Sequence, residues 1–375
     1  MRIAVVSNTA WYLCNFRLNL MRALQSAGYT VVAVAPMDNY VSQIQAAGFE
    51  FEHVAISGGG TNPLIEMQSV IGLWRVLRRQ RIDLVLSYTP KGNLYSALAC
   101  MGLGIAFLPN VSGLGRAFVR KSVITSVAQA LYKLTFSRAK RVFFQNNDDL
   151  RIFVDRKLVL PERAERIPGS GVDLSRFESV SLPSIGDRGP VFVLVARMMW
   201  DKGVGEYIEA ARTVKMAYPN SRFQLLGFVD VANPSAISGE KIQEWVDEGV
   251  VEYLGPTDDV RPWLAQSDCV VLPSYREGVP RTLLEAAAMA RPVITTDAPG
   301  CRDTLIDRKT GFLCRPADAP SLADSIQLFI KLTVDERIAM GLSGRAFVEK
   351  YFDEKLVLQR YLEVVGDVCA VSRRP

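Results

Sequence analysis

The stretch Cys269-Val-Val-Leu-Pro-Ser-Tyr-Arg-Glu-Gly-Val-Pro-Arg-Thr-Leu-Leu-Glu285 contains the strongest structural signal of the chain. It begins as an apolar run typical of a buried strand and passes through a turn with Glu277 and Gly278. It then continues as a helix predicted from about Arg281 to Ala290. Amide groups in the first turn of a helix attract anions. The stretch therefore predicts a strand–turn–helix unit with a diphosphate site at the start of the helix.

Two glutamates flank that predicted anion site. Glu285 lies about one turn into the helix, and helical side chains tilt toward the N-terminus, so it can reach past the phosphates to a pair of ribose hydroxyls. Glu277 precedes the helix on the opposite side, where a transferred sugar would lie, and Gly278 permits close approach of the backbone to a ligand. An ordinary strand–loop–helix with two solvated glutamates is the alternative, and spacing alone leaves it open.

A second segment, Val191-Phe-Val-Leu-Val-Ala-Arg-Met-Met-Trp-Asp-Lys-Gly203, places two cations at similar points. Arg197 stands where an apolar run ends, and Lys202 precedes a glycine and an amphipathic helix. Such cations can hold both phosphates of a diphosphate and neutralise it as it leaves. A pair of surface charges is the alternative when this segment is taken alone. The presence of both segments in one chain favours a shared site.

The rest of the chain continues the alternation of strands and helices. Strands separated by helices of ten or more residues predict parallel sheets covered on both faces, and hence an α/β fold. We expect an N-terminal domain at 1–170, a linker at 171–190, a C-terminal domain at 191–350 and a final helix at 351–375 that can pack back on the first domain. The predicted strands are Ile3–Val6, Val31–Ala35, Phe51–Ile56, Leu84–Leu86, Ile105–Leu108, Val142–Phe144, Val191–Ala196, Phe223–Gly227, Val250–Leu254, Cys269–Pro273 and Val293–Thr296.

Composition narrows the classes of function. Of the 375 residues, 49% are hydrophobic and 22% are charged, as expected for a well-folded globular protein. No signal peptide or membrane-spanning stretch is recognised, so a cytoplasmic location is the expectation. The 6 cysteines show no C-x-x-C spacing, and the single histidine, His53, is assigned a structural role. The cysteine spacing and the single histidine therefore disfavour a zinc centre and a Ser-His-Asp triad.

Positive charge is concentrated in the first part of the chain. Residues 1–170 contain 20 Lys and Arg against 10 Asp and Glu, whereas the remainder contains 24 against 29. Residues 116–141 contain seven of these cations and no acid, interleaved with apolar residues at broadly helical spacing. Such a basic amphipathic helix predicts peripheral contact with an anionic membrane, and a core helix with solvated ends is the alternative. Nucleic-acid binding is disfavoured because no reading motif accompanies the charge.

Taken in order, the motifs resemble those of a known family. The E-x7-E pair Glu277 and Glu285, the R-x4-K-G run from Arg197 to Gly203, and Gly171-Val-Asp-Leu-Ser-Arg-Phe177 are similar to the marks of family-4 retaining glycosyltransferases. The resemblance covers nearly the whole chain. It implies the GT-B fold, in which two Rossmann-like domains with parallel sheets face an interdomain cleft. It also implies sugar transfer from a nucleotide-diphosphate donor without a metal or another cofactor.

The resemblance further implies roles for individual residues. The position of Glu285 binds the ribose hydroxyls, that of Glu277 faces the donor sugar beside the reacting carbon, and those of Arg197 and Lys202 hold the distal phosphate. Backbone amides around the start of the helix also contact the donor. Those near Gly278, Val279 and Pro280 touch sugar hydroxyls, and those near Thr282 and Leu283 reach phosphate.

Within this family the chain is most similar to bacterial enzymes that extend undecaprenyl-diphosphate-linked sugars or build capsule and exopolysaccharide. The segments Tyr88–Tyr95, Ser112–Gly115 and Pro299–Arg302 carry that likeness. Gly113 and Gly115 are expected to form a loop near the donor, although an ordinary turn is an equal alternative.

Two residues of the first domain are expected to meet the acceptor. Lys91 is placed to meet its phosphate, although a solvated lysine is an equal alternative. Asn15 lies where some relatives carry a histidine, and it is the expected hydrogen-bonding substitute. Any mechanism that needs an imidazole at this point is disfavoured.

The favoured function is therefore a retaining glycosyltransferase that moves a hexose or N-acetylhexosamine, expected as a UDP sugar, onto a lipid-linked or polysaccharide-precursor acceptor. The expected place of action is the inner face of the cell membrane. A sugar-nucleotide epimerase of the same fold and a non-catalytic sugar-nucleotide-binding module stay open. An NAD-dependent oxidoreductase is disfavoured because Val5-Val-Ser-Asn-Thr9 stands where G-x-G-x-x-G would follow the first strand.

Overall fold

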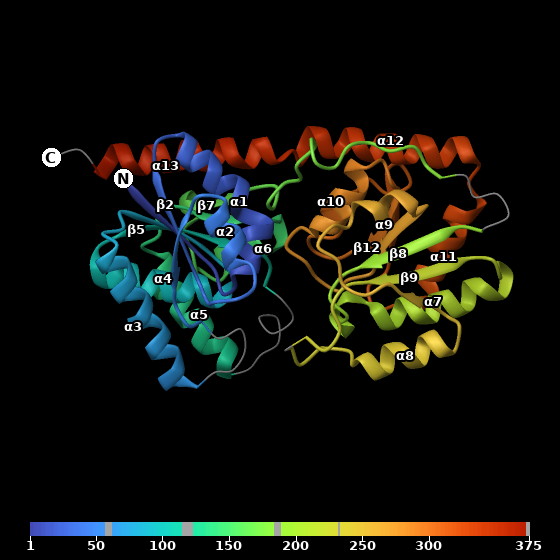
Figure 1. Ribbon diagram of the computed structural model, residues 1–375, viewed down its shortest axis with the longest axis horizontal. Coiled ribbons are helices and arrows are strands. Elements are labelled where there is room, and N and C mark those ends of the chain that lie inside the picture. The colour runs from blue at the N-terminus through green and yellow to red at the C-terminus, as the bar shows by residue number, and fades with distance from the viewer. Residues whose placement is uncertain (57–61, 115–122, 184–188, 232, 373–375) are drawn as a thin grey trace. The chain divides into compact units, whose positions relative to one another are not determined.

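The computed structural model describes the whole chain except residues 57–61, 115–122, 184–188, 232 and 373–375. The chain forms two compact units (Figure 1). The first contains Met1–Ser170 together with Lys355–Pro375, and the second contains Gly171–Glu354. The second unit is therefore inserted, in sequence, between two parts of the first.

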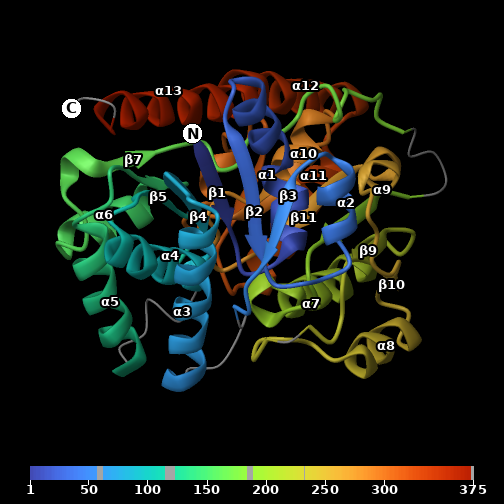
Figure 2. The ribbon, with the colours of Figure 1, turned by 60° about the vertical axis from the view of Figure 1, so that its left-hand side comes forward.

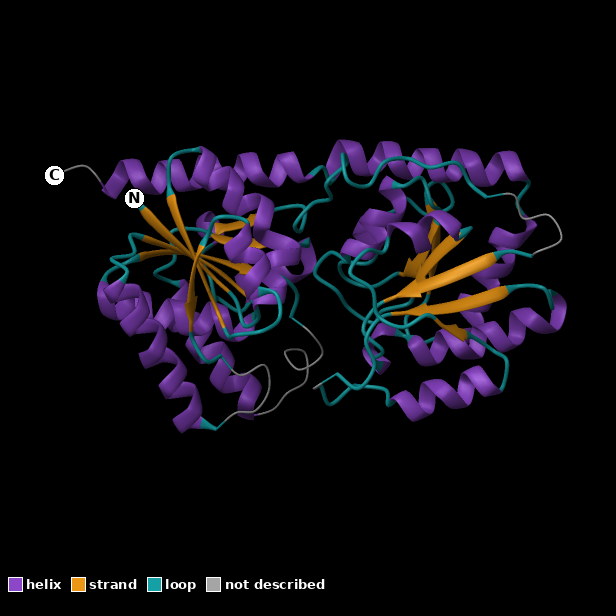
Figure 3. Cartoon of the chain, in the orientation of Figure 1, coloured by secondary structure: helices purple, strands orange, loops and turns teal. Residues whose placement is uncertain are grey.

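The first unit is built on a seven-stranded parallel sheet with the order β3-β2-β1-β4-β5-β6-β7. Helices cover both of its faces (Figure 3). Its strands are β1 (Arg2–Val6), β2 (Thr30–Ala35), β3 (Glu50–His53), β4 (Leu84–Tyr88), β5 (Ala106–Val111), β6 (Val142–Phe144) and β7 (Ala164–Arg166). Its helices are α1 (Ala10–Ser26), α2 (Val41–Ala46), α3 (Pro63–Arg79), α4 (Pro90–Leu103), α5 (Val123–Phe136), α6 (Asn147–Asp155) and α13 (Glu354–Ser372), with a short turn η1 (Pro161–Arg163).

The second unit repeats this arrangement with the sheet order β10-β9-β8-β11-β12-β13, again with parallel pairing throughout. Its strands are β8 (Val191–Val195), β9 (Arg222–Leu226), β10 (Glu252–Tyr253), β11 (Cys269–Leu272), β12 (Val293–Thr296) and β13 (Gly311–Cys314). Its helices are α7 (Val204–Ala217), α8 (Gly239–Asp247), α9 (Arg261–Gln266), α10 (Arg281–Ala288), α11 (Ala319–Lys331) and α12 (Val334–Tyr351), with the short turns η3 (Trp200–Lys202) and η4 (Arg302–Thr304).

Both sheets owe their stability to strands that are apolar on both faces. The burial of β8 is complete from Val191 to Val195, as expected for a central parallel strand between two helical layers. Phe192 and Leu194 face the layer that contains α7 and α11, whereas Val193 and Val195 face the layer that contains α10. The alternation places one hydrophobic core on each side of the sheet.

In each sheet, the direction in which successive strands are added reverses once. The reversal lies between β1 and β4 in the first unit and between β8 and β11 in the second. In open parallel sheets, ligands bind outside the carboxyl ends of the strands at such a switch point. The segments that follow β8 and β11 are the two that carry the strongest motifs of the sequence, so the topology brings them together.

The predicted α/β class with two parallel sheets is confirmed. Every predicted strand forms, with ends shifted by up to a few residues, and the structure adds β7 and β13. The final helix expected at 351–375 forms as α13, Glu354–Ser372, and is separate from α12, which ends at Tyr351. The helix predicted from Arg281 to Ala290 ends at Ala288, because Ala290 has a left-handed backbone with φ 57°.

The last helix, α13, packs on the first unit (Figure 2). Tyr361 is fully buried there, and its hydroxyl accepts a hydrogen bond from the side chain of Asn110 at 2.8 Å. Arg360 forms an ion pair with Glu165. The end of the chain therefore completes the hydrophobic core of the first unit.

The second unit begins and ends at neighbouring points. The backbone N–H of Val172 donates to the carbonyl of Phe352 at 2.9 Å, and that of Glu354 donates to the carbonyl of Val172 at 3.0 Å. Val172 and Phe177 are buried in the core of this unit. The chain therefore enters and leaves the second unit as a paired segment.

None of the helices, searched over the described residues, is both long and apolar enough to cross a membrane.

Candidate active site

The site is formed by the loops at the carboxyl ends of β8 and β11 in the second unit. Gly203, which follows η3, has φ 73°, and a Cβ atom there would lie 2.1 Å from the carbonyl oxygen of Pro273. Only glycine permits that approach. The N–H of Tyr275 also donates to the carbonyl of Asp201 at 3.1 Å. The two loops are therefore locked together through their backbones.

Lys202 and Glu277 form the ion pair at the centre of this arrangement. They lie 75 residues apart in the sequence, and their side chains are 21% and 15% exposed. Partial burial strengthens the attraction between opposite charges relative to bulk water. The structure thus brings together a cation and a carboxylate that the sequence placed on separate motifs.

The backbone of Glu277 is held from a third loop, the one that follows β12. Its N–H donates to the carbonyl of Pro299 at 3.0 Å. Gly300 has φ 79°, and a Cβ atom there would lie 2.3 Å from the carbonyl oxygen of Gly278 and 2.4 Å from that of Glu277. Pro299 and Gly300 therefore hold the backbone of Glu277 in place. They belong to the segment Pro299–Arg302, which carries part of the likeness to bacterial relatives.

The start of α10 has the properties of an anion site. Pro280 is the N-cap residue and makes no side-chain capping bond to the first turn. The hydroxyl of Thr282 donates to the carbonyl of Val195 at 3.2 Å, which joins the helix start to the end of β8. Leu283 and Gly278 are buried, and Val279 is partly buried. Uncapped amides at a helix start bind phosphate well.

Glu285 lies one turn into α10 and is mostly buried, with 12% of its side chain exposed. It forms an ion pair with Arg281 at 2.8 Å, four residues earlier on the same helix. Burial raises the pKa of Glu285, and the positive charges of Arg281 and Arg176 oppose that rise. The sequence motif did not identify either arginine, although the i, i+4 spacing of Arg281 and Glu285 is a recognisable signal.

Arg197 is placed differently from Lys202. It follows β8 and is exposed, and its side chain makes no ion pair with any residue that the structure describes. The structure therefore pairs Lys202 with Glu277 and leaves the guanidinium of Arg197 in solvent.

We expect Glu285→Gln to change both the pH dependence of the protein's stability and its affinity for nucleotide diphosphate. A raised carboxyl pKa means that the folded state favours the protonated form. The contribution of Glu285 to stability is therefore full below its unfolded-state pKa and is lost as pH rises through its folded-state pKa. Relative to the Gln variant, the native protein should be more stable near pH 4 than at neutral pH, which denaturant unfolding at both pH values measures.

The same variant should bind nucleotide diphosphate about ten- to a hundredfold more weakly, since a carboxylate hydrogen bond to a ligand is worth about 1.5–3 kcal/mol. Calorimetry measures that affinity. Glu209→Gln on α7, an exposed member of another ion pair, is the control. Equal nucleotide affinities for all three proteins would contradict the role assigned to Glu285.

The first unit holds the residues predicted to meet the acceptor. Lys91, near the start of α4, forms an ion pair with Glu66 at 2.7 Å, and both side chains are about one-fifth exposed. The side-chain amide of Asn15 donates to the carbonyl of Trp11 at 2.9 Å, one turn earlier in α1. Gly113 has φ 121° in the loop after β5. Gly115 lies outside the described residues.

A buried arginine near these positions was not identified from the sequence. Arg17 on α1 is 2% exposed, and its guanidinium stacks on the ring of Tyr88 at 4.1 Å and donates to the hydroxyl of Tyr12 at 3.1 Å. Burial opposes the positive charge, but the surrounding tyrosines, including Tyr361, keep the pKa of Arg17 above its ordinary value. Arg17 thereby joins α1 to the carboxyl end of β4.

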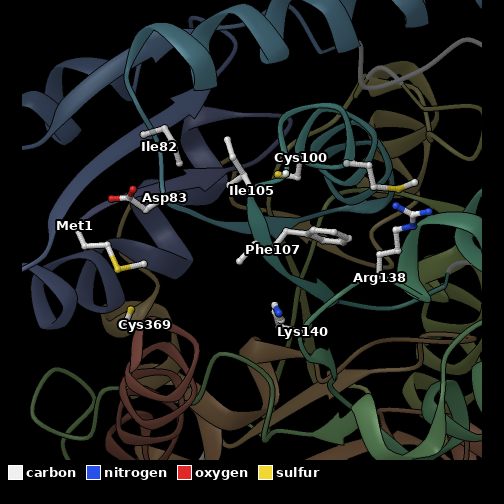
Figure 4. Close-up of a pocket in the computed structure, with 12 residues that line it drawn as sticks. Met1, Ile82, Asp83, Cys100, Ile105, Phe107, Arg138, Lys140 and Cys369 are labelled. Carbon is white, nitrogen blue, oxygen red and sulfur yellow. The ribbon is translucent and has the colours of Figure 1, made fainter. Parts of the chain in front are cut away.

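The first unit also contains a cavity of about 690 Å³ at the opposite edge of its sheet. Figure 4 shows Met1, Asp83, Ile105 and Lys140 around it, each just before a strand of the sheet. The cavity therefore opens at the amino ends of the strands, away from the switch point. Among the residues that the structure describes, no group of three or more His, Cys, Asp and Glu side chains is placed to hold a metal ion.

Two family profiles match the chain in succession. A profile described as Glycosyl transferase 4-like domain matches residues 15–169, and one described as Glycosyl transferases group 1 matches residues 189–331.

Curated relatives match along most of the chain. The chain is 28% identical to the N,N'-diacetylbacillosaminyl-diphospho-undecaprenol alpha-1,3-N-acetylgalactosaminyltransferase of Campylobacter jejuni, over 98% of this chain and 99% of that one. It is 25% identical to the UDP-Gal:alpha-D-GlcNAc-diphosphoundecaprenol alpha-1,3-galactosyltransferase of Escherichia coli, over 72% of this chain and 71% of that one.

Solved structures share the fold. An Anabaena protein in complex with UDP-glucose superposes with a TM-score of 0.80 at 17% identity, covering 98% of this chain and 100% of its own. The sucrose-phosphate synthase of Thermosynechococcus elongatus superposes with a TM-score of 0.79 at 19% identity, covering 99% of this chain and 100% of its own. The family and the GT-B fold expected from the motifs are confirmed. The chain belongs to the group 1, family-4-like glycosyltransferases and is a glycosyltransferase of the GT-B fold.

Proposed function

We propose that this enzyme transfers a hexose or N-acetylhexosamine, with retention at the anomeric carbon, from a UDP sugar to a sugar carried on a lipid diphosphate. The part of the proposal that concerns the UDP sugar rests on the Lys202–Glu277 ion pair beside the uncapped start of α10. The relatives from Campylobacter jejuni and Escherichia coli, named for transfer to undecaprenyl-diphosphate-linked sugars, support the acceptor half.

In the proposed reaction the donor displaces the Lys202–Glu277 ion pair. The ammonium of Lys202 moves to the distal phosphate, where Arg197 and the amides near Thr282 and Leu283 add further positive charge. Glu277 then faces the transferred sugar beside its reacting carbon, with the backbone around Gly278, Val279 and Pro280 against its hydroxyls. Glu285 binds the ribose hydroxyls from within α10. These groups take the place of a metal ion in neutralising the leaving diphosphate.

The chemical step is attack from the same face as the leaving group. The bond between the anomeric carbon and the phosphate oxygen breaks, and the acceptor hydroxyl oxygen bonds to that carbon. The proton of the hydroxyl passes to the departing phosphate oxygen. Charge that builds up on the phosphate is stabilised by donors already in place. Each such donor lowers the activation free energy by about 3–4 kcal/mol.

The acceptor is assigned to the first unit. Lys91 lies in the first turn of α4, which follows β4, and Asn15 lies in the second turn of α1, which follows β1. β1 and β4 form the switch point of that sheet. In the proposal the acceptor's phosphate replaces Glu66 as the partner of Lys91.

A panel of nucleotide sugars incubated with the full-length enzyme and a bacterial membrane extract tests the function. We expect release of nucleoside diphosphate and a mass increase of one hexose or N-acetylhexosamine on a lipid diphosphate, unchanged by excess EDTA. Nuclear magnetic resonance of the product should show the donor's anomeric configuration.

The other outcomes of that experiment distinguish the alternatives. Conversion of the nucleotide sugar without any acceptor would identify an epimerase. Tight nucleotide binding without product from any donor would identify a binding module. Loss of activity in EDTA that magnesium or manganese restores would overturn the metal-independent mechanism.

We further propose peripheral membrane contact through the basic segment 116–141. Arg116, Arg120 and Lys121 of this segment lie outside the described residues. In α5, Val127 and Leu134 are 54% and 53% exposed, and Lys133 in the last turn is also exposed. Apolar residues beside cations at a surface suit an anionic bilayer.

Lys133→Gln is expected to weaken binding to vesicles of phosphatidylglycerol and phosphatidylcholine about fivefold, since one cation near an anionic surface contributes about 1 kcal/mol. Cosedimentation measures this binding. Lys331→Gln is the matched control, because Lys331 is likewise an exposed cation in the last turn of a helix, in the second unit. Equal binding of the native protein to neutral and anionic vesicles would overturn the proposal.

A further inference from the structure

A second cavity of the first unit, of about 780 Å³, lies among α3, α4 and α5. α3 and α5 each pack against α4 (Figure 2). Its volume falls in the range of small-molecule sites, about 300–1,000 Å³. Its walls are mainly aliphatic and aromatic, with Val70 from α3, Leu98 from α4 and Leu131 from α5. The cavity is therefore suited to an apolar ligand.

One end of the cavity reaches the carboxyl edge of the sheet. Residues 111–114, which begin at the last residue of β5, line it, and so does Lys91, the second residue of α4, the helix that follows β4. Glu66, the partner of Lys91 at 2.7 Å, lines it as well. The apolar space thus ends at a cation, Lys91, that forms an ion pair with a carboxylate.

The other end opens to the surface between apolar side chains. Met67 of α3 and Val127 of α5 line the cavity, yet they are 59% and 54% exposed, so they stand at its mouth. Leu64, one turn before Met67, is 75% exposed. Exposed apolar residues gathered at one place on a soluble protein mark a lipid or partner site.

We infer that this cavity binds the isoprenoid chain next to the diphosphate of the acceptor. The inference rests on the proposed function and deepens it. A polyprenyl diphosphate carries an anionic head on a long apolar chain, and the cavity matches that order, with Lys91 at one end, apolar walls between and an apolar mouth at the other. The excess of cations in residues 1–170 favours an anionic amphiphile over an apolar protein segment as the occupant.

Chain-length dependence of the acceptor tests the inference. The enzyme is given one sugar diphosphate whose lipid end is either a single methyl group, which is too short to enter the cavity, or an undecaprenyl chain. Ala128→Trp fills the cavity from α5, and Val127→Ser makes its mouth polar without touching the core, because Val127 is largely exposed. Both variants should raise KM for the undecaprenyl acceptor at least tenfold, with kcat and the KM for the methyl acceptor changed by less than twofold.

Ala130→Trp is the matched control, since Ala130 lies on the same helix, is exposed and does not line the cavity. It should change neither KM. Equal KM changes for both acceptors in the cavity variants, or none for either, would overturn the inference. Absence of transfer to either acceptor by the native enzyme would instead overturn the proposed function on which the inference rests.

Photolabelling gives an independent readout. A benzophenone-bearing farnesyl diphosphate should label peptides of α3 and α5 that contain Met67 or Val127, and unlabelled undecaprenyl diphosphate should compete. Labelling confined to other parts of the protein would contradict the assigned site.

Discussion

Lys202→Met and Glu277→Gln are each expected to lower kcat by about 10²- to 10³-fold, the cost of removing one charge-stabilising group from a transition state. The two side chains form one ion pair in the unliganded protein, but the proposed reaction gives them separate tasks, one on the phosphate and one beside the sugar. Because both side chains are mostly buried, each variant is also expected to unfold at a lower temperature, and circular dichroism should establish that it is folded under the assay conditions.

Steady-state transfer assays with a radiolabelled donor measure this effect. Lys241→Met is the control, because Lys241 forms an ion pair with Glu244 on the surface of the same unit. The double variant should be slower than either single one, since the proposed reaction gives the two side chains separate tasks. Wild-type turnover in both single variants would end the assignment of this site.

Gly300→Ala is expected to lower kcat about 10²-fold, although residue 300 touches no substrate in the proposal. A methyl group there would meet the carbonyl oxygens of Gly278 and Glu277 at 2.3 Å and 2.4 Å, so the loop that carries Glu277 must shift. Displacement of a reacting group by about 1 Å costs on the order of 10²-fold in rate. The fold itself should persist, which circular dichroism and thermal unfolding check.

Gly249→Ala provides the matched control for this variant. Gly249 has φ 76°, close to the 79° of Gly300, but a Cβ atom at residue 249 would have no heavy atom within 4 Å. Both variants carry the same backbone strain of a left-handed alanine, about 1–2 kcal/mol. Only in Gly300→Ala does the added methyl group also displace the loop that carries Glu277. Equal activities of the two variants would show that the loop after β12 does not position Glu277.

The fold was largely predictable because its strands are short, apolar and separated by helices. Two strands were not predicted because they are short. β7 is the mostly polar, three-residue Ala164–Arg166 at a sheet edge, and β13 contains only Gly311–Cys314. The final helix was predicted to begin at residue 351, and α13 begins three residues later, at Glu354.

The sequence indicated individual residues of the candidate site but not which of them form ion pairs. Motifs on β8 and β11 identified Lys202 and Glu277 separately, because each lies in a local strand–turn–helix pattern. Their ion pair follows from the sheet order, which places β8 beside β11 across more than 70 residues. The burial of Arg17 among tyrosines depends likewise on α13, which returns from the far end of the sequence.

The adjacent entry and exit of the second unit have a practical consequence. Since Val172 is hydrogen-bonded to both Phe352 and Glu354, a gene fragment that encodes 171–354 has its two ends already side by side. Such a fragment is suited to production on its own or to exchange against the equivalent fragment of another glycosyltransferase. Under the proposed function, a chimaera of that kind would transfer a different sugar to the same acceptor.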